Sequence, residues 1–192
     1  MGCSQSYPGL TEDILEDYST LTYLTKGEVL HLMKKFYSIS PEKLKANYNH
    51  RFSKEEILQK FDVLRNNPFQ DRFFKVFSSK KDGHFSFEDI LDLASAMSPD
   101  CSLEAKAEWA FKLYDLDEDN QISERDITEI IDRITCDPNC YNRYLDNELK
   151  KKIANIILEE LKLDSTGSIG LIEFKIMMSR IPEFVSSFYF RL

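Results

Sequence analysis

The chain has 192 residues, of which 42% are hydrophobic, and this is enough for one large or two small cores without invoking disorder. Its formal net charge of -8 argues against nucleic acid as a ligand, whereas a basic or amphipathic peptide would complement it. No apolar stretch approaches the ~18 residues needed to span a bilayer, and the first residues lack the apolar core of a secretory signal, so we expect a cytosolic protein.

The first six residues, Met-Gly-Cys-Ser-Gln-Ser, fit the pattern for N-myristoylation. Gly2 would accept the acyl chain after removal of Met1, and the adjacent Cys3 is a candidate for palmitoylation. One myristoyl chain binds membranes only reversibly, whereas a second acyl chain makes residence stable. We therefore expect residues 1–25 to be an acylated extension, and the protein to be peripheral at the inner face of the plasma membrane or another cytosolic membrane. The alternative is that the N-terminus is an unmodified tail.

Helix signals follow in residues 26–98. Capping boxes at Thr25 to Glu28 and Ser53 to Glu56 precede apolar periodic stretches, which predicts helix starts there. Later in this segment, an apolar helix face with i, i+3, i+4, i+7 spacing is formed by Ile90, Leu93, Ala94 and Met97.

The run from Asp115 to Asp126, D-L-D-E-D-N-Q-I-S-E-R-D, places carboxylates at positions 1, 3, 5 and 12 of a twelve-residue loop. This is the spacing with which an EF-hand binds calcium, a hard cation that takes six to eight oxygen ligands. The predicted ligands are the side chains of Asp115, Asp117, Asp119 and Asp126, the backbone carbonyl of Gln121, and Ser123, directly or through a water.

Two residues depart from the EF-hand consensus. Position 6, usually Gly, is Asn120, which tolerates the left-handed conformation needed there. Position 12 is Asp126 rather than Glu, so bidentate capture of calcium is harder and magnesium becomes competitive. We therefore expect a calcium/magnesium site, the alternative being an acidic surface turn that holds no ion.

The helix after this loop repeats the apolar face, and so does the helix near the C-terminus. The two sets are Ile127, Ile130, Ile131, Ile134 and Phe174, Met177, Met178, Ile181. The three loops that precede the helices with this face, at 78–89, 115–126 and 162–173, also have an apolar residue at position 8, namely Phe85, Ile122 and Ile169. This residue is expected to pair neighbouring loops through a short β-contact. The repeat predicts an all-α protein of the EF-hand superfamily with four EF-hands paired into two lobes, an N-terminal helical extension and a C-terminal tail helix. We expect the lobes at 26–98 and 102–181, with a polar linker from Thr135 to Asn147.

The other loops have lost ligands. The loop from Lys162 to Glu173 carries an ammonium at position 1, which repels calcium, so metal binding at 162–173 is in doubt. The loop from Ser78 to Asp89 has Lys80 at position 3 and should be empty. A first loop would begin at Lys45 and has no acidic cluster. One metal site, at 115–126, is therefore expected.

The tail, residues 182–192, carries Phe184, Val185, Phe188, Tyr189 and Leu192 at helical spacing after Pro182. Such a helix either packs permanently on a lobe or fills the groove for a target helix and moves aside when the target binds. The candidate partner-binding residues, most of which are also core candidates, are Met97, Phe111, Ile130, Ile131, Ile134, Met177, Met178, Phe184 and Phe188.

Four segments resemble the calcium- and integrin-binding proteins, and the similarity covers nearly the whole chain. They are L-T-Y-L-T-K at Leu21 to Lys26, L-R-N-N-P-F-Q-D-R at Leu64 to Arg72, A-F-K-L-Y-D-L-D at Ala110 to Asp117, and P-E-F-V-S-S-F at Pro182 to Phe188. The resemblance implies four EF-hands with the first two inactive, an acylated N-terminus, and binding of integrin α cytoplasmic tails and other helical targets. Family members typically use both C-terminal hands, and Lys162 departs from that pattern.

These features favour a calcium-binding, membrane-associated adaptor that binds amphipathic helices. The alternative is a non-catalytic regulatory subunit of a phosphatase or kinase, as in calcineurin B-like proteins. An enzyme is not expected, because His31, His50 and His84 are scattered and no nucleophile motif or Gly-rich phosphate loop accompanies them.

Overall fold

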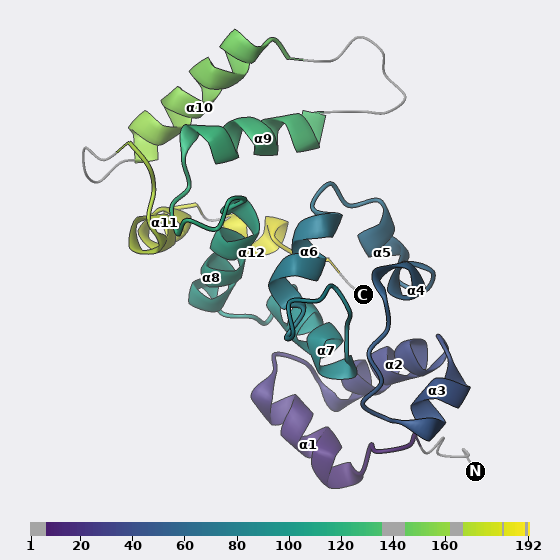
Figure 1. Cartoon of the computed structure of the whole chain (residues 1–192). Coiled ribbons are helices and arrows are strands. Elements are labelled where there is room, and N and C mark those ends of the chain that lie inside the picture. Colours follow the sequence, from purple (N-terminus) through teal and green to yellow (C-terminus); the bar gives the residue numbers. More distant parts are fainter. Residues whose placement is uncertain (1–6, 136–144, 162–166, 182, 191) are drawn as a thin grey trace. The chain divides into compact units, whose positions relative to one another are not determined.

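The computed structural model describes residues 7–135, 145–161, 167–181, 183–190 and 192 (Figure 1). In these residues all regular structure is helical, apart from two isolated antiparallel β-bridges. The expected all-α class is therefore confirmed. The chain divides into two compact units, Met1–Cys101 with Tyr189–Leu192, and Ser102–Phe188. Among the described helices, none combines the length and apolar character that crossing a membrane requires.

The first unit contains the first seven helices. They are α1 (Glu12–Leu21), α2 (Lys26–Tyr37), α3 (Pro41–Ala46), α4 (Lys54–Leu58), α5 (Asp62–Arg65), α6 (Gln70–Phe77) and α7 (Phe87–Ala96). Helix α2 packs on α1 and α7, and α6 also packs on α7. Both predicted capping boxes are confirmed, at Thr25 for α2 and at Ser53 for α4.

Aromatic rings form the centre of this unit. The ring of Phe36 lies 5.1 Å from that of Phe52 and 5.6 Å from that of Phe87, and Phe74 stacks on Phe85 at 4.5 Å. Phe52 and Phe85 exchange two backbone hydrogen bonds of 2.9 Å, so the loop before α4 and the loop before α7 are paired at these residues. The predicted β-contact at Phe85 is thereby confirmed.

The second unit contains the remaining helices. They are α8 (Leu103–Tyr114), α9 (Glu124–Thr135), α10 (Asn147–Leu161), α11 (Leu171–Met178) and α12 (Phe184–Ser187). Helix α8 packs on α11, and α9 packs on α10. Ile122 and Ile169 exchange backbone hydrogen bonds of 2.8 and 2.9 Å, as the repeat predicts. The core includes Ala110, Phe111, Ile127, Ile131, Leu158, Phe174 and Met178.

Two boundaries differ from the expected ones. Thr135 is the last residue of α9 and Asn147 the first of α10, so both ends of the predicted linker are helical, and residues 136–144 lie outside the described residues. The tail helix is also shorter than its apolar spacing predicts. It ends at Ser187, since Phe188 leaves the helical region with φ -84° and ψ 68°, and the last residues of the chain belong to the first unit. Tertiary contacts of those residues within the first unit override the local periodicity.

Candidate metal centre

The segment Asp115 to Asp126 joins α8 to α9 as a tight loop. The backbone N–H of Asp115 still donates to the carbonyl oxygen of Phe111 and so closes the last turn of α8. Asn120 adopts φ +65°, which confirms the left-handed conformation expected at position 6. Glu118, at position 4, also has a positive φ of 63°, which the spacing alone did not indicate. These turns let a short segment surround a central point.

Three carboxylates converge in this loop. Asp115, Asp117 and Asp126 each offer an oxygen atom within 4.8 Å of the others. Asp115 and Asp126 are buried, whereas Asp117 is exposed. Anionic oxygens gathered this closely match the ligands that Ca²⁺ and Mg²⁺ prefer, and they repel one another without a cation.

Hydrogen bonds orient the buried members of this group. Asp126 accepts from the backbone N–H of Leu116 at 3.0 Å through Oδ1, and from the N–H and hydroxyl of Ser123 at 2.9 and 2.6 Å through Oδ2. Asp115 Oδ2 accepts from the N–H of Asn120 at 3.0 Å. The loop backbone therefore holds positions 1 and 12 in place.

The electrostatics of the loop favour a bound cation. Burial raises the pKa of the Asp115 carboxyl above its ordinary value, and the negative charges of Asp119 and Asp126 act in the same direction. Backbone hydrogen bonds from Asn120 and Glu118 oppose that rise. A divalent ion would relieve the repulsion among the carboxylates, because it would supply positive charge between them.

The converging trio does not include Asp119, the fourth predicted carboxylate ligand. Asp119 Oδ1 accepts from the N–H of Gln121 at 2.8 Å, and the side chain of Gln121 accepts from the hydroxyl of Ser168 at 3.0 Å. The Gln121 side chain thus faces the partner loop, which fits a prediction that uses only its backbone carbonyl. Ser123 is engaged with Asp126, as described above.

The partner loop is only partly described. Lys162, whose charge decides the expectation for this loop, lies outside the described residues together with residues 163–166. Gly167 has φ +85° at position 6, and Glu173 at position 12 accepts from the N–H of Gly170 at 2.8 Å. Glu173 therefore caps the start of α11.

The structure places the predicted partner-binding residues in both units and at different depths. Phe111, Ile131, Met178 and Phe184 are buried in the core of the second unit. Met177 and Phe188 pack against this core. Ile130 is half-buried, and Ile134 is 60% exposed. Met97 belongs to the first unit. Gly2 and Cys3, the predicted acylation sites, lie outside the described residues.

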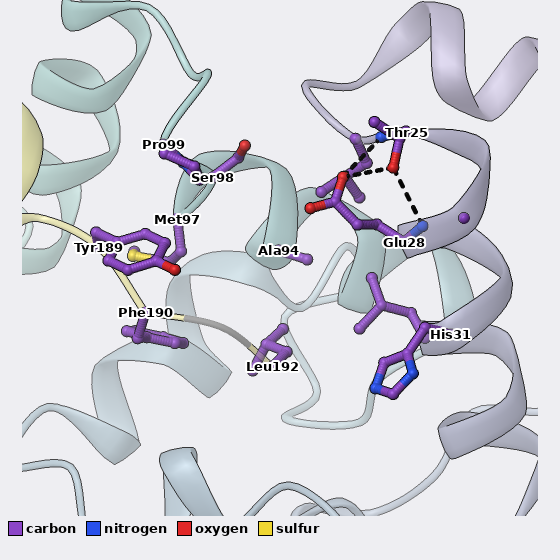
Figure 2. A pocket seen from close by; sticks show the side chains of 13 residues that line it. Thr25, Glu28, His31, Ala94, Met97, Ser98, Pro99, Tyr189, Phe190 and Leu192 are labelled. Carbon is purple, nitrogen blue, oxygen red and sulfur yellow. Dashed lines mark hydrogen bonds between the residues drawn. The ribbon is translucent and has the colours of Figure 1, made fainter.

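A cavity of about 430 Å³ in the first unit was missed by reasoning from sequence (Figure 2). It lies beside the start of α2, the end of α7 and the last residues of the chain; Met97 is the one predicted partner-binding residue on its wall. Tyr189, Phe190 and Leu192 also line it, and the Phe190 ring meets that of Phe73 edge-on at 5.5 Å. The apolar character of the last residues indicates that they pack against other parts of the chain, but which parts they contact follows only from the fold.

Arg51 in the first unit was missed as well. Its guanidinium donates to Ser78, Ser79 and Asp82 in the loop before α7, and to Asp89 in the first turn of α7. The local sequence marks Arg51 only as the residue before Phe52, whose pairing with Phe85 brings the two loops together.

Comparisons with known proteins agree with this geometry. A family model described as an EF-hand domain pair matches residues 104–179. The chain is 30% identical over 185 residues to calcium and integrin-binding family member 2 of Homo sapiens, and the alignment covers 95% of this chain and 96% of that protein. It is 31% identical to the Drosophila melanogaster protein of that name over 187 residues, and 28% identical to the Danio rerio protein over 189 residues, with the same coverage of 95% and 96% in both. With identity at this level along almost the whole of both sequences, the chain belongs to the calcium and integrin-binding family of EF-hand proteins.

Proposed function

We propose that this protein is a non-catalytic, calcium- and magnesium-binding adaptor that associates with cytosolic membranes and binds amphipathic helical segments. The family name suggests integrins as one target class, and within it we propose the cytoplasmic tails of integrin α subunits. The observation that carries the metal part is the convergence of Asp115, Asp117 and Asp126 at loop positions 1, 3 and 12.

The proposal includes four EF-hands in two lobes, residues 26–98 and 102–181. The β-bridge between Phe52 and Phe85 supports an EF-hand pair in the first unit, because it repeats the bridge between Ile122 and Ile169 in the segment that the family model matches. Residues 1–25 would be the acylated extension and residues 182–192 the tail.

The metal site would use the side chains of Asp115, Asp117, Asp119 and Asp126, with the Gln121 carbonyl and Ser123 completing the shell. Because Asp126 is one methylene shorter than the usual Glu, magnesium would compete with calcium. Lys162 would keep the neighbouring loop empty, since its ammonium stands at position 1.

Calorimetric titration of metal-stripped protein tests this part directly. One calcium site, weakened by excess magnesium, is the expected result. Two sites would contradict the role given to Lys162, and no site would leave a metal-independent adaptor.

Target binding is proposed at the cavity of the first unit. Its wall combines apolar groups from α2 and α7 with the chain's own C-terminal residues, of which Tyr189 remains 38% exposed (Figure 2). A target helix would displace residues 189–192 and cover the apolar surface that they leave. The net charge of -8 favours a basic target.

Membrane association would depend on the N-terminal acyl chains. Co-expression with an N-myristoyltransferase and a palmitoyl acyltransferase, followed by vesicle sedimentation, tests this, with Gly2→Ala removing the myristoyl acceptor. We expect Gly2→Ala to stay in the supernatant and Cys3→Ser to bind more weakly than the doubly acylated chain. Sedimentation of Gly2→Ala equal to the native chain would contradict acyl anchoring.

A further inference from the structure

The Arg51 guanidinium lies inside the loop from Ser78 to Asp89. It donates to Ser79 Oγ at 2.8 Å and Asp89 Oδ2 at 2.9 Å from Nη1, and to Ser78 Oγ at 3.1 Å, Asp82 Oδ1 at 3.0 Å and the His84 carbonyl oxygen at 2.5 Å from Nη2. Its side chain is only 13% exposed, and that of Asp89 only 2%.

Four of these oxygens belong to ligand positions of an EF-hand. Ser78, Asp82, His84 and Asp89 stand at positions 1, 5, 7 and 12 of the loop, and position 7 contributes its backbone carbonyl as it would to an ion. We infer that the Arg51 guanidinium occupies the cation position of this loop and makes its conformation independent of metal.

The backbone of the loop supports this inference, because it reproduces that of the acidic loop at 115–126. Positive φ occurs at positions 4 and 6 in both, namely Lys81 (55°) and Gly83 (72°) against Glu118 (63°) and Asn120 (65°).

Three backbone hydrogen bonds also recur in the two loops. In each loop the N–H groups of positions 2 and 9 donate to the carboxylate of position 12, and the N–H of position 7 donates to the carboxylate of position 5. In the first unit the distances are 3.0 Å from Ser79 to Asp89, 2.8 Å from Ser86 to Asp89 and 3.0 Å from His84 to Asp82. In the second unit they are 3.0 Å from Leu116 to Asp126, 2.9 Å from Ser123 to Asp126 and 2.8 Å from Gln121 to Asp119.

The pairing of neighbouring loops explains how Arg51 reaches this place. Arg51 stands at position 7 of the degenerate first loop and directly precedes Phe52, which bridges to Phe85. Gln121 has the equivalent position in the second unit, and it too bonds to the partner loop, at Ser168. A long cationic side chain at this position can therefore enter the neighbouring loop.

The charges are consistent with an internal cation. Asp89 is buried, and a buried carboxylate needs a paired positive charge. The His84 N–H and the Arg51 guanidinium also hold the pKa of the Asp82 carboxyl well below its ordinary value. Helix α7 starts within this loop, and both its Ala94 and Met97, which directly follows the helix, line the cavity of the first unit. That wall would therefore keep its shape without calcium.

Amide hydrogen exchange of the full-length chain, with chelator and with calcium, tests the inference. The amides of Ser79, His84 and Ser86 should exchange equally slowly in both conditions. In Arg51→Gln with chelator they should exchange at least about tenfold faster, as expected for losing a hydrogen bond between charged groups. The matched control is Arg65→Gln, which removes a half-exposed arginine of the same unit.

Two outcomes would overturn the inference: calcium-dependent exchange of these amides in the native chain, or unchanged exchange in Arg51→Gln. If Arg51→Gln unfolds the unit, the milder variant Arg51→Lys takes its place. It keeps the positive charge but lacks the two guanidinium NH₂ groups that bond to the loop, so the amides should exchange at intermediate rates. The equivalent amides of Leu116, Gln121 and Ser123 report separately on the proposed metal site. A failure of that site is therefore distinguishable from a failure of this inference.

A second test restores the acids of the loop. Ser78→Asp with Lys80→Asp, in a chain that also carries Asp115→Ala, gives carboxylates at positions 1, 3, 5 and 12. Calcium affinity should be at least about tenfold higher when Arg51→Gln is added, because the guanidinium otherwise repels and displaces the ion. Two results would count against occupation of the cation position by Arg51: equal calcium affinity of the restored loop with and without Arg51→Gln, or no calcium binding by either of these two variants.

Discussion

At the scale of single residues, the two best-formed loops differ in what balances their acids. Around Asp89 the positive charge is supplied by Arg51, whereas around Asp126, where three carboxylates converge, we propose that an external ion supplies it. The two acids accept corresponding backbone hydrogen bonds, so the loop backbone alone does not distinguish them. The distinction lies in one side chain from a neighbouring loop.

Removing the first ligand should abolish high-affinity metal binding. In Asp115→Ala the buried position-1 carboxylate is lost. In a calorimetric titration we therefore expect no heat of calcium binding at concentrations that saturate the native chain. Glu118→Gln is the matched control, because it removes one negative charge from an exposed, non-ligand position of the same loop. Calcium binding retained by Asp115→Ala would mean that the loop with Lys162 is functional.

Lengthening the last ligand should shift the preference between ions. Asp126→Glu restores the side chain that binds calcium through both oxygens, so calcium affinity should rise relative to magnesium affinity, by roughly tenfold. Paired titrations with each metal measure the ratio, and Glu124→Asp serves as a control with the opposite one-methylene change outside the ligand positions. An unchanged ratio would show that Asp126 does not set ion preference.

Much of the metal loop could be predicted from the sequence, since local spacing fixes its chemistry. Asn120 has the expected left-handed conformation, and Ile122 makes the expected bridge. The role of Arg51 could not be predicted in the same way, because its partners lie 27 to 38 residues away in the chain. Such a contact depends on how two loops pair, which no local pattern specifies.

At the scale of helices, sequence signals were accurate where a helix begins and less so where it ends. The hydroxyl of Thr25 accepts from the N–H of Glu28, whose carboxylate accepts from the N–H of Thr25 at 2.8 Å. These bonds are local, so the sequence specifies them. The end of α12 is instead decided by the contacts of Tyr189, Phe190 and Leu192 within the first unit, which helical spacing does not specify.

Loss of this cap should destabilise the first unit selectively. Thr25→Ala leaves the N–H of Glu28 without its capping acceptor and should cost about 1 kcal/mol of unfolding free energy. Urea denaturation followed by hydrogen exchange of α2 amides measures the loss. Thr20→Ala, within α1, removes a hydroxyl that donates to the Glu16 carbonyl oxygen of the same helix, and should cost less. Equal costs would show that the capping box does not secure α2.

At the scale of the whole chain, the tail contributes to both units, and its two halves have different roles. Phe184 is buried in the core of the second unit and stacks on Phe188 with ring centroids 5.7 Å apart. Tyr189, Phe190 and Leu192 line the cavity of the first unit. Removing the whole tail would therefore damage a core, so displacement by a target is best tested beyond Phe188.

Deleting residues 189–192 should tighten target binding, because the target no longer competes with the chain's own C-terminus. The probe is a basic amphipathic peptide, with a scrambled peptide of equal charge to detect non-specific attraction. A chain in which 189–192 are replaced by polar residues of equal number controls for length and should behave like the deletion. Calcium titration should be unchanged in both, since the metal loop belongs to the other unit. If the deletion binds the peptide no more tightly than the native chain, the C-terminal residues are a permanent part of the first unit's core and the target must bind elsewhere.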